Sequence, residues 1–230
     1  MELQKDDIAK MIEISAVQMP DGEEEIKELV KSAKQYSFAC VYTLPCWVSY
    51  LKELMMDDSS THLASTVGFP SGAHSPEVKM FEAEELIKHG IQELDLVMNV
   101  GMLRSGRHDF IKKEIKALVE ITEGIIVKVI LEVDYLTHDE IKKGCEICIN
   151  ASADFVKTST GWIHENVKLE IISMITSFVG NAIKVKAAGG IRELNNIIEM
   201  YKLGVTRFGI NTKAAIKILH ECDDHFGELK

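Results

Sequence analysis

The amino-acid sequence predicts an α/β protein built as a single (β/α)8 barrel, and three observations lead to this fold class. The length of 230 residues suits one large α/β domain. Short apolar segments rich in β-branched residues alternate with amphipathic segments rich in Glu and Lys, which is typical of βα units around a parallel sheet. The eight apolar segments follow one another without a Pro- or Ser-rich linker, so we expect residues 1–230 to form one closed barrel.

The candidate strands lie in the apolar segments, and helices fill the intervals between them. One helix, at 75–90, should begin at Ser75 and Pro76, because serine is a good N-cap and proline fits the first helical position. The alternative fold is an open doubly wound sheet. Its dinucleotide-binding form would carry G-x-G-x-x-G after the first strand, and this sequence has none there. We predict strands at 12–16, 39–44, 64–69, 93–99, 125–133, 153–160, 182–188 and 206–211.

Composition and charge narrow the classes of function. Apolar residues make up 46% of the chain and charged residues 27%, which is ordinary for a soluble globular protein and argues against disorder. The formal net charge of −10 disfavours nucleic acid or an anionic membrane as a partner, because the overall field repels them. No apolar run reaches transmembrane length and residues 1–13 have no signal-peptide core, so we expect a cytoplasmic protein.

The cysteines fit reduced thiols in the cytoplasm, because they are odd in number and lack the spacing of a disulfide framework. Two of them form a C-x-x-C inside a helical pattern, without a second pair or a nearby His to complete a zinc site. We interpret those two as thiols packed in a helix. The five cysteines are Cys40, Cys46, Cys145, Cys148 and Cys222.

Ionisable residues occur in the middle of four successive predicted strands, where lysine and aspartate are seldom buried without a partner. Because side chains alternate along a strand, residues two or four apart share a face. Structural ion pairs inside the barrel, or faces directed outward, would explain any single lysine. Several such residues near the C-terminal ends of adjacent strands favour an active site instead, because barrel active sites lie at that end. The predicted pairs on one face are Asp95 with Asn99, Lys128 with Glu132, Lys157 with Ser159, and Lys184 with Lys186.

Two lysines and a carboxylate are the minimum equipment for forming and breaking an imine. A lysine amine attacks a carbonyl only when it is neutral, and an unperturbed lysine is almost wholly protonated at pH 7. A second cation nearby and partial burial lower the pKa of the nucleophile. Lys186, on the strand that follows Lys157, is placed to be that cation. Asp95 can pair with the second lysine and move protons through an ordered water.

Glycines after the last two predicted strands indicate where an anion could bind. Gly189 and Gly190 come directly after a strand, where backbone N–H groups can hold an anion at the start of the next helix. Gly209 repeats the arrangement in the eighth strand. A Gly-Gly at a strand end is more often only a tight turn. Two such turns on neighbouring strands favour a phosphate site, because barrels often bind phosphate after strands seven and eight.

Five segments together resemble the deoxyribose-phosphate aldolase family, over most of the chain. The resemblance implies the barrel fold and a class I aldolase, a lyase that cleaves 2-deoxyribose 5-phosphate reversibly to acetaldehyde and glyceraldehyde 3-phosphate. We expect no metal and no cofactor, because the sequence has no clustered His, Cys and Asp ligands and an imine supplies the electron sink. The segments are TVGFPSGAHSPEVKMFEAEELIKHG at 66–90, ELDLVMNVGMLRSG at 93–106, VKVILEVDYLT at 127–137, ADFVKTSTG at 153–161 and VKAAGGIR at 185–192.

Carried over onto matching positions, the resemblance assigns a role to nine residues, and a tenth, Asn211, stands where the family has a serine. Lys157 in KTSTG becomes the Schiff-base lysine, Lys186 in KAAGG the cation that tunes it, and Asp95 in ELD the proton-relay carboxylate. Lys128 and Thr160 would line the pocket. The residues expected to hold the phosphate are Gly161, Gly189, Gly190 and Gly209 through backbone N–H groups, and Asn211 through its side-chain amide.

The sequence departs from the family pattern mainly in the parts that would face the ligand. An aspartate and a threonine are usual near the N-terminus, a cysteine and an asparagine two strands in, and paired serines after the last-strand glycine. A glycine is usual on the seventh strand. The residues found instead are, in the same order, Glu13 and Ser15, Tyr42 and Leu44, Asn211 and Thr212, and Lys184.

These departures leave two alternative functions open. One is a related Schiff-base aldolase or thiolase that acts on another phosphorylated sugar. The other is a catalytically silent barrel that binds a sugar phosphate. In each case the partner molecule is a small phosphorylated sugar or aldehyde, and a homo-oligomer, dimeric or tetrameric, is compatible with the resemblance.

Overall fold

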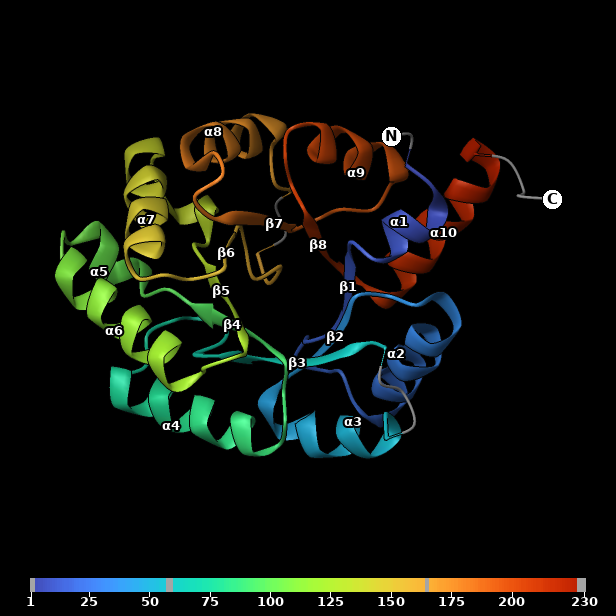
Figure 1. Cartoon of the computed structure of the whole chain (residues 1–230), viewed down its shortest axis with the longest axis horizontal. Coiled ribbons are helices and arrows are strands. Elements are labelled where there is room, and N and C mark those ends of the chain that lie inside the picture. Colours follow the sequence, from blue (N-terminus) through green and yellow to red (C-terminus); the bar gives the residue numbers. More distant parts are fainter. Residues whose placement is uncertain (1–2, 57–59, 164–165, 227–230) are drawn as a thin grey trace.

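Eight parallel strands close into a barrel in the order of the chain, with β1 paired to β8 (Figure 1). The computed structural model describes residues 3–56, 60–163 and 166–226. The (β/α)8 prediction is confirmed, and the open doubly wound alternative is wrong because the sheet has no edge. The strands are β1 (Ile12–Ala16), β2 (Cys40–Thr43), β3 (His62–Val67), β4 (Glu93–Val97), β5 (Ile126–Ile130), β6 (Phe155–Lys157), β7 (Lys184–Ala188) and β8 (Arg207–Asn211).

Helices surround the barrel, and the first and last of them, α1 and α10, lie side by side (Figure 1). An ion pair of 2.6 Å between Lys5 Nζ and Asp223 Oδ2 joins these two helices. None of the helices in the described part of the chain has the length and apolar character that crossing a membrane requires. The helices are α1 (Lys5–Ala9), α2 (Glu23–Tyr36), α3 (Val48–Leu54), α4 (Pro76–Lys88), α5 (Val100–Arg104), α6 (His108–Ile121), α7 (His138–Asn150), α8 (Leu169–Val179), α9 (Leu194–Lys202) and α10 (Thr212–Phe226), with 3-10 turns η1 (Pro45–Trp47) and η2 (Val133–Tyr135).

Local sequence fixes the helix starts. Helix α4 begins at Pro76 with Ser75 as its N-cap, as predicted, although the serine side chain makes no capping hydrogen bond. Helix α7 begins with a capping box, in which Thr137 Oγ1 accepts from the Glu140 N–H at 3.3 Å and Glu140 Oε2 accepts from the Thr137 N–H at 2.7 Å. Cys145 and Cys148 are buried in α7 as free thiols, which confirms the interpretation of the C-x-x-C.

The two faces of the strands have opposite character. Apolar residues that alternate along each strand, such as Ile14, Leu94 and Val129, pack against the helices in the main hydrophobic core. The other face points into the barrel, where branched apolar side chains are usual. Here the interior instead carries buried ionisable residues, among them Glu13, Asp95, Lys128 and Lys186, beside a small apolar cluster of Val17, Cys40, Tyr42 and Ala64.

Three strands end before the second residue of a predicted pair, so three of the expected shared faces do not exist. Strand β5 stops at Ile130, and Glu132 lies beyond it with a left-handed φ of 55°. Strand β4 stops at Val97, and Asn99 caps α5 by accepting from the Met102 N–H at 3.0 Å. Strand β6 stops at Lys157, before Ser159. Backbone hydrogen bonds still link the segments beyond the end of β5, where the Leu131 N–H donates to the Lys157 carbonyl oxygen at 2.9 Å and the Val133 N–H to the Thr158 carbonyl oxygen at 3.0 Å. The alternation of residue types does not reveal where the regular strand stops.

A buried ion pair holds two helices to the barrel. Lys79 of α4 and Glu114 of α6 are almost completely buried, and Lys79 Nζ donates to Glu114 Oε2 and to the Val97 carbonyl oxygen at 3.0 Å each. Gly68 makes room for the lysine stem, because a Cβ there would lie 2.7 Å from Lys79 Cε. Burial lowers the pKa of Lys79 and raises that of Glu114, so desolvation offsets part of the attraction within the pair.

We expect Glu114→Ala to lower the free energy of unfolding by about 3–5 kcal/mol, because it leaves a buried ammonium without its counter-ion. Chemical denaturation monitored by circular dichroism measures this. Glu120→Ala on the same helix is the matched control, since its ion pair with Lys116 is exposed, and it should cost no more than about 0.5 kcal/mol. Equal losses in the two variants would contradict this account.

Candidate active site

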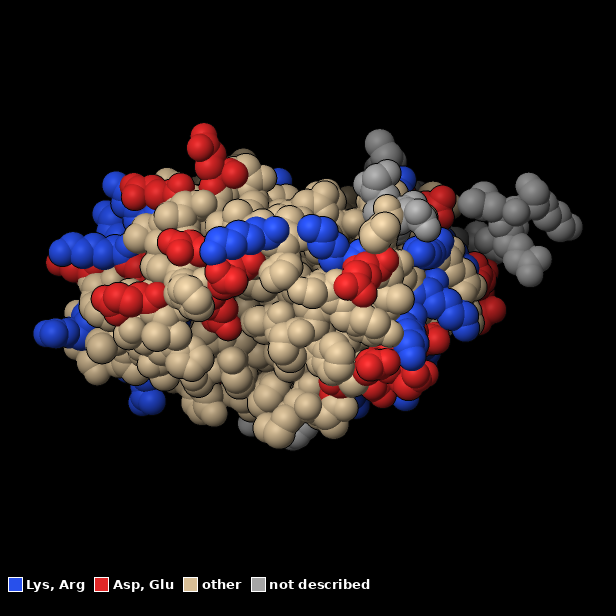
Figure 2. All heavy atoms as spheres, turned by 90° about the horizontal axis from the view of Figure 1, so that it is seen from below, with Lys and Arg blue, Asp and Glu red and all other residues tan. Residues whose placement is uncertain are grey.

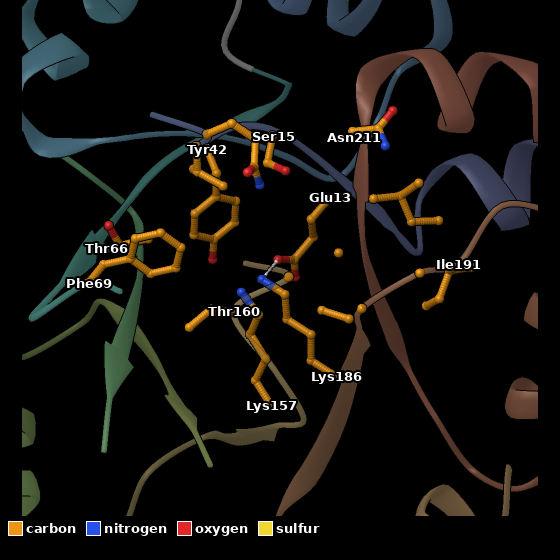
Figure 3. A pocket seen from close by; sticks show the side chains of 18 of the residues that line it. Glu13, Ser15, Tyr42, Thr66, Phe69, Lys157, Thr160, Lys186, Ile191 and Asn211 are labelled. Atoms are coloured by element: carbon orange, nitrogen blue, oxygen red, sulfur yellow. Dashed lines mark ion pairs between the residues drawn. The ribbon is translucent and has the colours of Figure 1, made fainter. Parts of the chain in front are cut away.

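A pocket opens at the C-terminal ends of the strands, where (β/α)8 barrels place their active sites (Figure 3). Lys157 and Lys186 point into it beside Glu13, with Tyr42 across from them (Figure 3). The residues that line it are Glu13, Ser15, Val17, Gln18, Tyr42, Thr66, Phe69, Lys157, Thr160, Gly161, Lys186, Ala188, Gly189, Gly190, Ile191, Arg192, Gly209, Ile210 and Asn211.

Asp95 holds both lysines at the floor of the pocket. Its Oδ2 accepts from Lys157 Nζ and from Lys186 Nζ, each at 2.8 Å. The two lysines are neighbours because β6 and β7 pair with Lys157 opposite Lys186. Asp95 comes from β4 across the interior and has no exposed surface. The structure therefore brings together the three residues predicted to be catalytic.

Burial is the main reason why the pKa of Lys157 lies below its ordinary value, and the charge of Lys186 lowers it further. The carboxylate of Asp95 opposes both effects. Burial alone would raise the pKa of Asp95, but the charges of Lys157, Lys186 and Lys128 bring it well below its usual range. Asp95 thus stays an anion beside Lys157, whose lowered pKa makes its proton easier to remove than that of an ordinary lysine.

A second layer of charges lies beneath the two lysines. Glu13, fully buried, forms ion pairs with Lys186 and, at 3.3 Å, with Lys128. Despite burial, which raises it, the pKa of Glu13 is held below its ordinary value by Lys128 and Lys186. Glu93 pairs with Lys128, and Arg207 lies 3.7 Å from Glu13 and 3.8 Å from Glu93.

Charge balance in this network favours a neutral Lys157. The carboxylates of the network are Glu13, Glu93 and Asp95, and its cations are Lys128, Lys157, Lys186 and Arg207. These three anions face these four cations, His62 beside Glu93 not being counted, so the loss of one proton from a lysine balances their charges. Lys157 is the lysine with the most exposed side chain, at 9% against 1% for Lys186 and 0% for Lys128.

Two lysines do not lie where the sequence suggested. Lys128 was expected to line the pocket, and this is wrong, because β5 pairs it with Phe155, one layer below Lys157, and its side chain is fully buried. Lys184 shares a face with Lys186 but lies at the N-terminal end of β7, exposed, with Nζ 5.4 Å from the centre of the Phe155 ring. Lys184 is therefore not part of the pocket.

The expected phosphate residues line the outer part of the pocket. Gly161, Gly189 and Gly190 have φ values of 80°, 107° and 69°, in the left-handed region that favours glycine. A Cβ on Gly190 would collide with Asn166. Gly209 has a further reason to be glycine, because a Cβ there would lie 3.2 Å from Lys186 Cε.

Asn211 lies at the rim, where its Oδ1 accepts from the Ala214 N–H at 3.0 Å and so caps α10. Thr160 also lines the pocket; its N–H donates to Glu132 Oε1 at 3.0 Å, and its Oγ1 accepts from the Trp162 N–H at 3.1 Å. Lys213 is exposed at the start of α10.

Several lining residues were not predicted as site residues. Thr66, Phe69 and Arg192 carry no signal in the sequence beyond their place near strand ends. Glu13 and Tyr42 were noticed only as departures from a family pattern. Glu13 could have been found by the argument that identified Lys128, since it is an acid in the middle of an apolar strand.

One hydrogen bond and one aromatic contact, both made by Trp162, bridge the mouth of the pocket. Trp162 Nε1, in the segment after β6, donates to the Val17 carbonyl oxygen after β1 at 2.9 Å. The Trp162 ring meets Phe69, after β3, edge to face with centroids 5.7 Å apart. Segments that follow three different strands are thereby tied together over the interior.

The arrangement can form and hydrolyse an imine: a buried amine with a lowered pKa, a permanent anion beside it and a second ammonium meet in one pocket. Among the residues that the structure describes, no group of three or more His, Cys, Asp or Glu side chains could hold a metal ion. Fold and pocket together define a (β/α)8 barrel with lysine chemistry at its C-terminal mouth.

Comparison with known proteins gives the family. Residues 5–207 match the model of the DeoC/LacD family aldolases. The chain is 43% identical to the deoxyribose-phosphate aldolase of Sinorhizobium medicae, over 94% of this chain and 87% of that protein. Among solved structures, the aldolase QR15 superposes with a TM-score of 0.90 at 36% identity, covering 97% of this chain and 99% of that one. The deoxyribose phosphate aldolase of Aeropyrum pernix has a TM-score of 0.87 at 27% identity, covering 99% and 94%. This protein belongs to the DeoC/LacD family of aldolases, which are lyases.

We expect Lys186→Leu to lower the rate and to move the acidic limb of the pH–rate profile to higher pH. Removing a positive charge beside Lys157 raises the pKa of that amine, so a higher pH is needed to deprotonate it. Lys184→Leu is the control, because Lys184 lies outside the pocket, and its profile should match that of the wild type. A limb unmoved by Lys186→Leu would mean that burial alone lowers the pKa of Lys157.

Proposed function

We propose that this protein cleaves 2-deoxyribose 5-phosphate reversibly to acetaldehyde and glyceraldehyde 3-phosphate, through an imine on Lys157. The observation that carries the proposal is the pair of 2.8 Å contacts by which Lys157 and Lys186 share Asp95 Oδ2. The family membership and the names of the relatives support the same reaction.

In the proposed reaction the neutral amine of Lys157 attacks C1 of the open-chain sugar, and loss of water gives an iminium ion. The bond between C2 and C3 then breaks, and its electron pair moves into the iminium system to give an enamine. The proton of the C3 hydroxyl leaves through Asp95 and an ordered water, which releases glyceraldehyde 3-phosphate. Protonation of the enamine carbon and hydrolysis return acetaldehyde and free Lys157.

The charges around Lys157 suit this sequence of steps. Burial and the charge of Lys186 lower the pKa of Lys157, so its amine loses a proton more readily than that of an ordinary lysine. When the iminium forms, the positive charge at Lys157 returns and Asp95 lies against it. The carboxylate therefore stabilises the charge that develops during the reaction without having to move.

The phosphate end of the substrate is proposed to lie at the outer glycines, Gly161, Gly189, Gly190 and Gly209, with Asn211 at the rim. Arg192, also in the lining and exposed, adds a cation there that suits a phosphate. This local positive group matters because the net charge of −10 repels an anionic substrate from the protein as a whole.

We expect borohydride to trap acetaldehyde covalently on Lys157, as peptide mapping by mass spectrometry would show. Lys157→Ala should abolish turnover and trapping, and Lys157→Arg should do the same, because a guanidinium stays protonated and cannot attack. Lys184→Arg, at the opposite end of β7, is the matched control and should keep full activity. Labelling of Lys186 or Lys184 in the wild type would overturn the assignment, and no labelling at all would favour the silent barrel.

Asn211→Ser should lower KM for deoxyribose 5-phosphate by about tenfold and leave kcat nearly unchanged, since one added hydrogen bond to a charged group is worth roughly 1.5–3 kcal/mol. A serine hydroxyl is shorter than the amide, and it also preserves the N-cap of α10. Steady-state kinetics with a panel of sugar phosphates is the measurement. A raised KM, together with a better alternative substrate for the wild type, would show a pocket shaped for another phosphorylated sugar.

We also propose that the chain forms a homo-oligomer in the cytoplasm. Val78 and Phe81 on α4 are exposed apolar side chains, and the side of the molecule that carries α3 and α4 has a broad area free of charged residues (Figure 2). The Aeropyrum pernix relative is described as tetrameric. The mass in solution, measured by light scattering, distinguishes a dimer or tetramer from a monomer.

The proposed location in the cytoplasm is supported by the free cysteines, which fit a reducing compartment.

A further inference from the structure

The hydroxyl of Tyr42 lies between the catalytic carboxylate and the charges beneath it. Tyr42, on β2, is 3% exposed, and its hydroxyl donates to Asp95 Oδ1 at 2.9 Å. The same oxygen accepts from Lys128 Nζ at 2.7 Å. Lys128 Nζ itself is 4.0 Å from Asp95 Oδ1. The phenol therefore occupies the position in which Lys128 and Asp95 would otherwise meet directly.

The two oxygens of Asp95 thus have separate partners. Oδ1 is held by the neutral Tyr42 hydroxyl, and Oδ2 by Lys157 and Lys186. Because hydrogen bonds hold both of its oxygens, the plane of the carboxylate is fixed. Tyr42 thereby sets the orientation of Oδ2 toward the two lysines.

Tyr42 is suited to this place because it carries no charge. Burial and the neighbouring carboxylates Asp95 and Glu13 raise its pKa well above the ordinary value, so the hydroxyl keeps its proton. It can accept from one ion and donate to another without altering the charge balance of the network. An ionised side chain in the same position would add a charge to the buried network.

The chain of contacts continues to the other end of the barrel. Lys128 pairs with Glu93, and Glu93 Oε1 lies 2.7 Å from Nδ1 of the half-exposed His62. In this series Tyr42 joins Lys128 to Asp95 through its two hydrogen bonds.

We propose that Tyr42 is a positioning residue of this active site, which holds Asp95 toward Lys157 and Lys186 and keeps it from a direct hydrogen bond with Lys128. The inference rests on the proposed role of Lys157 as the imine-forming lysine. Without the hydroxyl, Asp95 Oδ1 is free to turn toward Lys128. Lys157 then loses part of its counter-ion, and the proton relay through Asp95 is misaligned.

The test is Tyr42→Phe in the full-length protein. We expect kcat to fall about tenfold to a hundredfold, the effect of one hydrogen bond to a charged group, while KM changes little. The rate of acetaldehyde trapping by borohydride at Lys157, measured against pH, should have its acidic limb displaced to lower pH, because an amine with a weaker counter-ion has a lower pKa. A purely structural loss would not move this limb.

Tyr36→Phe is the matched control, because that hydroxyl lies 3.4 Å from His220 Nε2, away from the barrel interior. Its kcat and its trapping profile should equal those of the wild type. Melting temperatures of both variants show whether each is folded under the assay conditions.

The outcomes separate this inference from the proposed function. Trapping at Lys157 in the wild type with an unmoved limb in Tyr42→Phe overturns the positioning role and leaves the aldolase assignment intact. A limb displaced to higher pH also overturns it, since Asp95 would then have moved closer to Lys157. No trapping at Lys157 in the wild type overturns both.

Discussion

The active site depends on one shared oxygen atom. Asp95 Oδ2 accepts from two lysines on neighbouring strands, and Lys186 is also paired with Glu13. Burial and the charge of Lys186 lower the pKa of Lys157, because a second ammonium group beside it is costly in a buried place. Lys157, whose side chain is the more exposed of the two, is the lysine that we propose as the nucleophile. In the proposed reaction its reactivity follows from the charges around it, so the other groups of the interior have to keep those charges in place.

This requirement explains why the barrel interior is unusually polar. Most of the stabilising apolar surface lies between strands and helices, so the interior is free to hold ions. Each of those ions costs free energy to desolvate and is tolerated because an opposite charge touches it. Glu13 and Glu93 are the counter-ions of Lys186, Lys128 and Arg207. The Lys79–Glu114 pair shows the same principle outside the barrel, where it joins helices and has no part in chemistry.

The sequence was sufficient for the fold and for selecting three residues that meet in the pocket, for a physical reason. Lys157, Lys186 and Asp95 are ionisable residues inside apolar strands, and only a site or an ion network explains such positions. Alternation tells which face a residue occupies but not its depth, so Lys128 and Lys184 were indistinguishable from the other lysines. The end of β5 was misjudged because the left-handed Glu132 accepts a long-range hydrogen bond from the Thr160 N–H. The end of β4 was misjudged because Asn99 makes a local cap with the Met102 N–H, which the alternation of residue types does not show. The long-range contacts of Tyr42 and Glu13 join strands far apart in the chain, and a periodic pattern contains no information about them.

The bridge made by Trp162 with Val17 and Phe69 restricts the route by which a ligand can reach the pocket. It crosses the mouth between the segments that follow β1, β3 and β6, while Gly190, Arg192 and Asn211 are exposed at the ends of β7 and β8. In the proposed binding mode the uncharged carbonyl end of the sugar phosphate lies at Lys157, and the anionic end lies among these exposed residues. The doubly charged group then stays near water, where its hydration is largely retained. Only the part of the molecule that reacts has to be dehydrated.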